Sequence, residues 1–302
     1  MKRLFHAKTI KARLLWYNLC IICIIAVIFS VSSYLTANKK AVEVATNSLT
    51  YHVESLSYRY KMAYEEMVNI ILNCTERGAF NLKQVGRMKT AAQRRNGIEY
   101  ASLASSYCAI TGYGSYIKRL SVFSDDGVMV QAGTALSSTD DGQRICGAPW
   151  FFEEQAKEMD RYQLKLRDPL FYGEREQSLP IIHPISGSGG QEWAAVFLSP
   201  KLFQDELASN DNGNEVIVVT ADGERVAALH EDPGHREEND RLIAGILKAG
   251  KGRGTFDRLI HGADSKITYE TYARSGITVV EILDLDTLKN DRLMLLQTVI
   301  LI

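Results

Sequence analysis

The chain has 302 residues, 46% hydrophobic and 24% charged, a composition that suits a folded protein and excludes a low-complexity chain. Its formal net charge is −1, so it lacks the overall positive field of nucleic-acid-binding proteins, and no nucleic-acid partner is expected. Its five cysteines encode no disulfide framework, because two lie in an apolar run and an odd number remains outside it.

The N-terminal segment has the pattern of a membrane anchor. Residues 1–13 carry five Lys or Arg and no acid, and residues 14–35 contain no Asp, Glu, Lys, Arg or His. A run of this length crosses a hydrocarbon core of about 30 Å as a helix. We therefore expect a cytoplasmic N-terminus at 1–13, a transmembrane helix at 14–35 and extracytoplasmic residues 36–291 in the cell membrane. A cleaved secretory signal is the alternative, but the run is long and VSSYLTANKK offers no good cleavage site.

A second apolar run, RLMLLQTVILI, occupies residues 292–302 and is too short to cross a bilayer. We interpret it as the start of a second transmembrane helix, with the chain being a fragment of a longer receptor. The alternative is a genuine chain end whose short apolar tail docks on the membrane or on the first span.

Residues 36–110 are expected to form a long stalk helix and a second helix, the latter at about 83–109. In the stalk, apolar residues recur every seventh position in two columns that together make one helical stripe. This stripe can pack on its own domain or form the contact of a parallel homodimer, and the pattern leaves both open. The two columns are Val42, Leu49, Leu56, Ala63 and Ile70, and Val53, Tyr60, Met67 and Cys74.

One hairpin pattern occurs twice. VFSDDGVMVQAG at 122–133 and VVTADGERVAAL at 218–229 align without a gap, and each predicts a strand, an Asp-Gly turn and a strand. In both copies helical and strand segments follow in the same order, ending at VFLSPKLF in the first and at EILDLDTL in the second. The recurrence predicts an α+β fold of two modules, each an antiparallel sheet with flanking helices, at 111–210 and 211–291.

This order of segments resembles the double Cache sensor domains of bacterial membrane receptors, in which two PAS-like modules follow a stalk helix. The resemblance covers most of the chain and rests on the anchor, the stalk, the WFFEEQAK helix, the VFLSPKLF step and the returning span. The layout is most similar to Gram-positive sensor histidine kinases that regulate carbohydrate uptake. The 111–210 module would then be membrane-distal and the 211–291 module membrane-proximal.

The resemblance implies a ligand-sensing input region whose kinase half, with its response-regulator partner, lies beyond these residues. A chemoreceptor and a cyclic-dinucleotide enzyme are alternative outputs. A membrane-anchored binding or adhesion protein without cytoplasmic output is a further alternative.

No catalytic site, metal site or cofactor is expected in these residues. The GxxxxGK pattern ending at Lys251 has Gly252 where a phosphate-binding loop needs Ser or Thr. The two histidines of HEDPGH at 230–235 are separated by Pro-Gly, so they do not share a helical face as zinc ligands do. The paired aspartates at 125–126 and 140–141 lack the alternating oxygen ligands of a calcium loop.

A small-molecule site is expected in the long aromatic and charged connection 150–180. Aromatic rings stack on sugars, Asp accepts hydrogen bonds from hydroxyls, and Arg binds carboxylates in bidentate fashion, so a sugar or an organic acid is the expected ligand. Relatives that bind amino acids have an arginine two residues before the tryptophan and a tyrosine after it, where this chain has Ala148 and Phe151. For Trp150 and Phe151, packing in the protein core is the alternative to ligand binding. The predicted site residues are Trp150, Phe151, Tyr162, Arg167, Asp168 and Tyr172.

Overall fold

The computed structural model describes residues 10–75, 109, 111–125, 129–133, 141–171, 173–185 and 192–286. The chain divides into two compact units, which are considered separately: Leu49–Asp284, and Met1–Ser48 together with Leu285–Ile302. The second predicted helix and the apolar run at 292–302 lie outside the described residues, apart from residue 109.

Helix α1 (Ile10–Thr75) contains no Gly or Pro, so no residue interrupts its hydrogen-bond ladder. Within the described part of the chain, it is the one helix long and apolar enough to cross a membrane, and none of its most apolar window is buried. Among the described residues, none therefore covers the apolar side chains of this window.

The first sheet has four antiparallel strands in the order β2-β1-β4-β3. Its strands are β1 (Ile117–Ser124), β2 (Met129–Ala132), β3 (Leu179–Pro184) and β4 (Glu192–Leu198). Between β2 and β3 lie α3 (Asp141–Cys146), α4 (Phe151–Gln155) and a 3₁₀ turn, Met159–Arg161, and α5 (Lys201–Ser209) follows β4. The WFFEEQAK helix expected from the sequence is shorter in the structure and ends at Gln155, and the backbone at Glu158 is extended. We call this part the four-stranded module.

The second sheet has five antiparallel strands in the order β6-β5-β9-β8-β7. Its strands are β5 (Glu215–Val219), β6 (Arg225–Leu229), β7 (Arg253–Ile260), β8 (Ala263–Tyr272) and β9 (Ile277–Asp284). Helix α6 (Arg236–Ala249) follows a 3₁₀ turn, Pro233–His235, and ends at Gly250 in the left-handed conformation. We call this part the five-stranded module.

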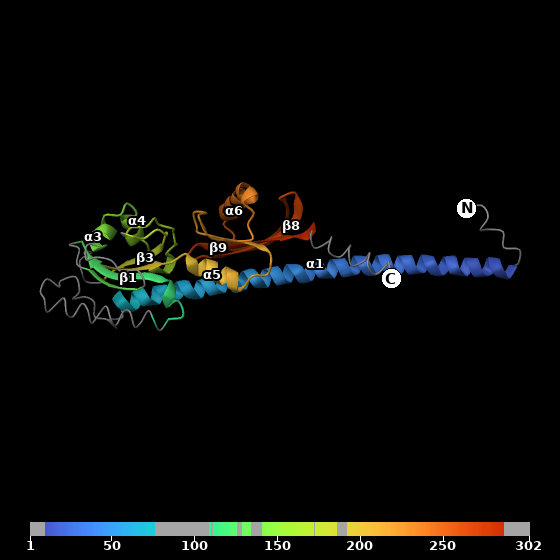
Figure 1. The fold of residues 1–302 in the computed structure, drawn as a ribbon, viewed down its shortest axis with the longest axis horizontal. Coiled ribbons are helices and arrows are strands. Elements are labelled where there is room, and N and C mark those ends of the chain that lie inside the picture. The colour runs from blue at the N-terminus through green and yellow to red at the C-terminus, as the bar shows by residue number, and fades with distance from the viewer. Residues whose placement is uncertain are drawn as a thin grey trace. The chain divides into compact units, whose positions relative to one another are not determined.

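The two sheets repeat one topology, as the recurring hairpin predicts. Hairpins β1–β2 and β5–β6 occupy equivalent edges, and β4 and β9 pair beside β1 and β5 in the same antiparallel sense. Figure 1 labels β1 and β3 of the first sheet and β8 and β9 of the second. The strands β4 and β9 end within the VFLSPKLF and EILDLDTL segments, so the second sequence echo also marks equivalent elements. The additional strand β7 extends the second sheet beyond the repeat.

The α1 stripe packs against its own domain. Side chains of α1 share one apolar core with β1, β3 and β4 of the first sheet, with α5, and with β5 and β9 of the second. Of the two alternatives for the stripe, own-domain packing therefore holds from residue 49 onward, and these residues are not free to contact a second copy. The stripe residues with at most 3% exposure are Leu49, Val53, Leu56, Tyr60, Ala63, Met67 and Ile70.

A buried carboxylate also joins α1 to the last strand. Glu281 on β9 is fully buried, and its Oε2 lies 2.7 Å from Nδ1 of His52 on α1. The amides of Asn212 and Asn214 each donate to its Oε1 at 2.7 Å. Hydrogen bonds to both oxygens offset the cost of burying this charge.

Candidate functional site

A cleft of about 610 Å³ opens beside α4, and we call it the α4 cleft. Most of its lining comes from the four-stranded module, and one residue comes from the β5–β6 turn of the other module. The lining residues are Pro149, Trp150, Glu153, Leu166, Arg167, Asp168, Pro169, Leu170, Gln177 and Glu224.

Backbone pairing fixes the charged wall of this cleft. Arg167 and Ser178 exchange two backbone hydrogen bonds, of 2.8 and 3.0 Å, in an isolated antiparallel bridge. The bridge sets Asp168 beside Gln177, whose Nε2 donates to Asp168 Oδ1 at 3.1 Å. This amide orients the carboxylate, which is exposed to solvent and available to a ligand.

A buried carboxylate beneath the wall organises the surrounding side chains. Glu154 of α4 is fully buried, and its Oε2 accepts from Tyr162 at 2.7 Å and from Lys157 at 2.6 Å. Its Oε1 accepts from the Arg167 guanidinium at 2.5 and 3.1 Å. Burial and the Glu154 charge raise the pKa of the Tyr162 hydroxyl well above its usual value, so it remains a donor. The network holds α4 to the connection that follows it.

The rim of the α4 cleft carries a second ion-pair group. Glu153 accepts from Lys165 at 2.5 Å and from Arg167 at 2.9 Å. These two cations lower the pKa of the Glu153 carboxyl from about 4.5 to about 2. The Arg167 guanidinium thus already binds two carboxylates, and it also lies 5.7 Å from the Trp150 ring centroid. A bidentate grip on a ligand carboxylate, as expected from the sequence, requires displacing these partners.

The lining is acidic overall. It holds three carboxylates, Glu153, Asp168 and Glu224, against the single guanidinium of Arg167. Carboxylates accept hydrogen bonds from hydroxyl and ammonium groups, and they repel anions at close range. Together with the flat Trp150 side chain, this lining suits a hydroxylated or cationic molecule better than an anionic one.

The structure brings three of the six predicted site residues together in this cleft, namely Trp150, Arg167 and Asp168. Phe151 and Tyr162 are buried and do not line it. Tyr172 lies outside the described residues. The binding role of all six stays a prediction.

Sequence reasoning missed Glu153, Gln177 and Glu224 among the lining residues. Glu153 had a local signal, because it lies in the first turn of a helix that starts beside Trp150. Glu224 had none, because it reaches the cleft only through the packing of the two modules.

An aromatic cluster covers the face of the first sheet that points away from the core shared with α1. Phe151 packs against Trp193 at 5.1 Å and Phe123 at 6.2 Å between ring centroids, and Ala148 belongs to the same cluster. The two positions at which amino-acid-binding relatives carry arginine and tyrosine are thus buried, apolar core positions in this chain. Within the described residues, no group of three His, Cys, Asp or Glu is placed to hold a metal ion.

Comparison with known proteins identifies the fold. No protein-family model matches the chain, and no curated protein does. The sensory domain of the Campylobacter jejuni chemoreceptor Tlp3 superposes with a TM-score of 0.56 at 11% identity, covering 82% of this chain and 97% of that one. The extracellular domain of vpHK1S-Z8, described as a histidine kinase, gives 0.55 at 13% identity, covering 82% and 98%. The chain shares the fold of these domains, which is the double Cache fold expected from the sequence. The predicted α+β class and its paired antiparallel-sheet modules are therefore confirmed.

The neighbours in fold come from proteins of different kinds, namely a histidine kinase, a chemoreceptor and a GGDEF family protein. A domain of a sensory box/GGDEF family protein from Vibrio parahaemolyticus also matches, with a TM-score of 0.54 at 12% identity, covering 82% of this chain and 99% of that one. The Tlp3 sensory domain has been solved with isoleucine bound. At 11–13% identity the similarity shows the fold, and it does not indicate which signalling output or which ligand this chain has.

Proposed function

We propose that this chain is the extracytoplasmic ligand-sensing region of a membrane-anchored signalling receptor, and that the α4 cleft binds a hydroxylated small molecule such as a sugar. The observation that carries the proposal is the cleft lining, in which Trp150 offers a flat apolar face beside three carboxylates. Rings of this kind stack on the C–H faces of sugars, and carboxylates accept from their hydroxyls. An organic acid is the weaker candidate, because Arg167 is already bound by Glu153 and Glu154.

The proposed topology puts residues 1–13 in the cytoplasm, a span at 14–35 and residues 36–291 outside. The four-stranded module at 111–210 would be membrane-distal, and the five-stranded module at 211–291 membrane-proximal. The charge bias around the first span supports this orientation.

A contiguous set of contacts leads from the α4 cleft to the second sheet. Lys157, bound to Glu154 beneath the cleft wall, donates to the backbone oxygen of Gln163 at 2.9 Å. The next residue, Leu164, donates its backbone N–H to Ser275 O at 2.8 Å, in the turn between β8 and β9. A shift of α4 on ligand binding would therefore reach the strand that leads toward the second apolar run.

The same turn is tied to α1. Arg274 donates to both oxygens of Glu65 at 2.6 and 2.7 Å and to the backbone oxygen of Asp160 at 3.1 Å. One side chain thus joins the stalk helix, the first module and the β8–β9 turn. A ligand shifts a receptor only through its different affinities for two conformations, and movement at this junction is a physical route for that shift.

For the output we propose a two-component histidine kinase, of the Gram-positive kind that regulates carbohydrate uptake, acting on a response regulator. The suitability of the cleft lining for a sugar supports it, and the extracellular domain of vpHK1S-Z8, described as a histidine kinase, is among the fold neighbours. A chemoreceptor is the second candidate, because the Tlp3 domain matches equally well. Autophosphorylation with ATP by the full-length protein would favour the kinase, and its absence the chemoreceptor.

Titration calorimetry on the full chain in detergent tests the ligand site. The probes are a panel of mono- and oligosaccharides together with citrate and succinate, and a sugar is expected to bind. Asp168→Ala should then weaken binding by about 1 to 3 kcal/mol, the usual cost of leaving polar partners unpaired. His230→Ala, in an exposed pair with Asp211 in the other module, is the control and should leave affinity unchanged. Unchanged affinity in Asp168→Ala with lost affinity in His230→Ala would place the ligand in the other module.

A further inference from the structure

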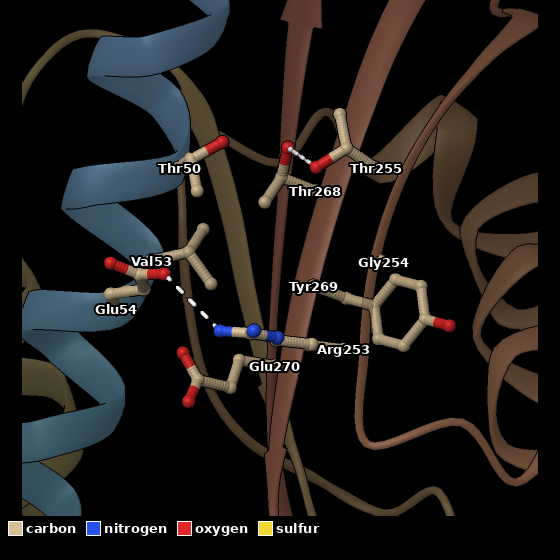
Figure 2. A pocket seen from close by; sticks show the side chains of 9 residues that line it. All are labelled: Thr50, Val53, Glu54, Arg253, Gly254, Thr255, Thr268, Tyr269 and Glu270. Carbon is tan, nitrogen blue, oxygen red and sulfur yellow. Dashed lines mark hydrogen bonds and ion pairs between the residues drawn. The ribbon is translucent and has the colours of Figure 1, made fainter.

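A second cleft, of about 450 Å³, lies between α1 and the β7–β8 pair, and we call it the α1 cleft (Figure 2). It belongs to the five-stranded module and shares no lining residue with the α4 cleft. Its lining residues are Thr50, Val53, Glu54, Arg253, Gly254, Thr255, Thr268, Tyr269 and Glu270.

Strand register directs the polar groups of this cleft toward α1. Arg253 pairs opposite Glu270, and Thr255 pairs opposite Thr268, one position removed on each side from the Gly254–Tyr269 pair. Because side chains alternate across a strand, these four share one face of the sheet. Figure 2 shows the Glu270 carboxylate and the Arg253 guanidinium on the side facing Glu54 of α1.

Glu270 is the unusual member of the set. Its Oε2 is buried and has no hydrogen-bond partner among the described residues. A buried acceptor without a partner costs free energy, and an added donor recovers it. The one cation in the lining, Arg253, is 78% exposed and pairs instead with Glu54, at 3.7 Å. An exposed pair at that distance is weak and easily displaced.

We propose that the α1 cleft binds a small organic cation, an amine whose ammonium group sits between Glu270 and Glu54. The lining holds two carboxylates and one guanidinium, so one added positive charge would make the cleft electrically neutral. The hydroxyls of Thr255 and Thr268, 3.1 Å apart, offer hydrogen bonds to a second polar group of the ligand. An organic cation fits better than a metal ion, because no trio of His, Cys, Asp or Glu is placed to chelate one within the described residues.

The electrostatics of Glu270 give the site a pH signature. Burial, and then the nearby Glu54 charge, raise the pKa of the Glu270 carboxyl, while Arg253 lowers it. An ammonium ion between the carboxylates favours the ionised form, so its affinity should fall as acid protonates Glu270. This site goes beyond the sugar site proposed above and would give the receptor a second input, at the point where α1 meets the second sheet.

Calorimetry on the full chain in detergent tests this site with ethanolamine, putrescine and cadaverine. Butane-1,4-diol and succinate serve as neutral and anionic analogues of putrescine. We expect at least one amine to bind and neither analogue to do so. Glu270→Gln should weaken the amine about tenfold or more, the effect of removing a charged hydrogen-bond partner. Glu54→Gln, an exchange between two good helix formers, should also weaken it.

Two further variants distinguish binding in the α1 cleft from binding elsewhere on the chain. Glu237→Gln makes the same exchange at an 88% exposed position on α6 and should leave amine affinity unchanged. Asp168→Ala, in the α4 cleft, should also leave it unchanged. The proposal is overturned if no amine binds, if butane-1,4-diol binds as well as putrescine, if neither Glu270→Gln nor Glu54→Gln weakens the amine, or if Asp168→Ala abolishes its binding.

Discussion

Glu154 is the residue on which the α4 network depends most. It is fully buried and accepts hydrogen bonds from Lys157, Tyr162 and Arg167. Glu154→Gln removes the negative charge that Lys157 and Arg167 contact. Breaking a buried ion pair in this way typically lowers the free energy of unfolding by about 3 to 5 kcal/mol. We expect a loss of stability at the lower end of that range, because the Lys157 and Arg167 side chains are both partly exposed to solvent. Chemical denaturation of wild type and variant measures it.

Glu153 provides the matched control one position earlier. Its side chain is 47% exposed and pairs with Lys165 and Arg167, so Glu153→Gln should cost less than about 1 kcal/mol. Its pKa is lowered in the folded protein, so its contribution is present above about pH 4.5 and disappears as the pH falls toward 2. The stability difference between wild type and Glu153→Gln should therefore shrink over that interval. If Glu153→Gln destabilised the protein as much as Glu154→Gln, the proposed difference between the exposed and the buried carboxylate would be wrong.

At the scale of elements, the β8–β9 turn depends on a glycine. Gly276 has φ +73°, and an added Cβ would lie 2.7 Å from Cβ of Ala221. Gly276→Ala should therefore cost more than the roughly 1 to 2 kcal/mol of left-handed backbone strain alone. Gly250→Ala is the control, because Gly250 has φ +63° with no atom within 4 Å of the added Cβ. Thermal unfolding compares the two, and equal losses would mean that the contact with Ala221 relaxes freely.

The helices and strands were largely predictable from local sequence patterns. The tertiary contacts between them were not. Apolar alternation and Asp-Gly turns marked β5–β6, and the seven-residue spacing marked α1. Whether the α1 stripe faces its own domain depends on strands and a helix that are distant in the sequence, from β1 to β9, so spacing alone left it open. The α4 cleft shows the same limit, since Trp150 and Asp168 were found from their local chemistry and Glu224 was not. The unpartnered oxygen of Glu270 depends on strand register and on the position of α1.

For the whole molecule, the exposed face of α1 gives a prediction about assembly. With the stripe buried, a parallel homodimer requires another face, and we propose the one formed by Tyr51, Tyr58 and Met62. These side chains are 72%, 60% and 43% exposed, and their spacing of seven and four residues sets them in one line along the helix.

Replacing both tyrosines by Glu should convert the dimer to a monomer, because like charges would then face each other across the interface. Light scattering after size-exclusion chromatography in detergent measures the mass. Phe152→Glu is the control, because Phe152 is 71% exposed on α4, and it should leave the dimer intact. A wild-type monomer, or a dimer that survives the double change, would rule out this face.

The shared core also has a consequence for how the protein is made. Glu65 on α1 and its partner Arg274 are 209 residues apart, and the α1 stripe packs on β9 at a similar separation. At about 5 to 20 residues per second, roughly 10 to 40 s of synthesis pass before the ribosome completes that strand. During this interval the stripe emerges from the ribosome without its last partners and is open to aggregation. Substitutions along the stripe should therefore lower the yield of folded protein, which expression trials of such variants would measure.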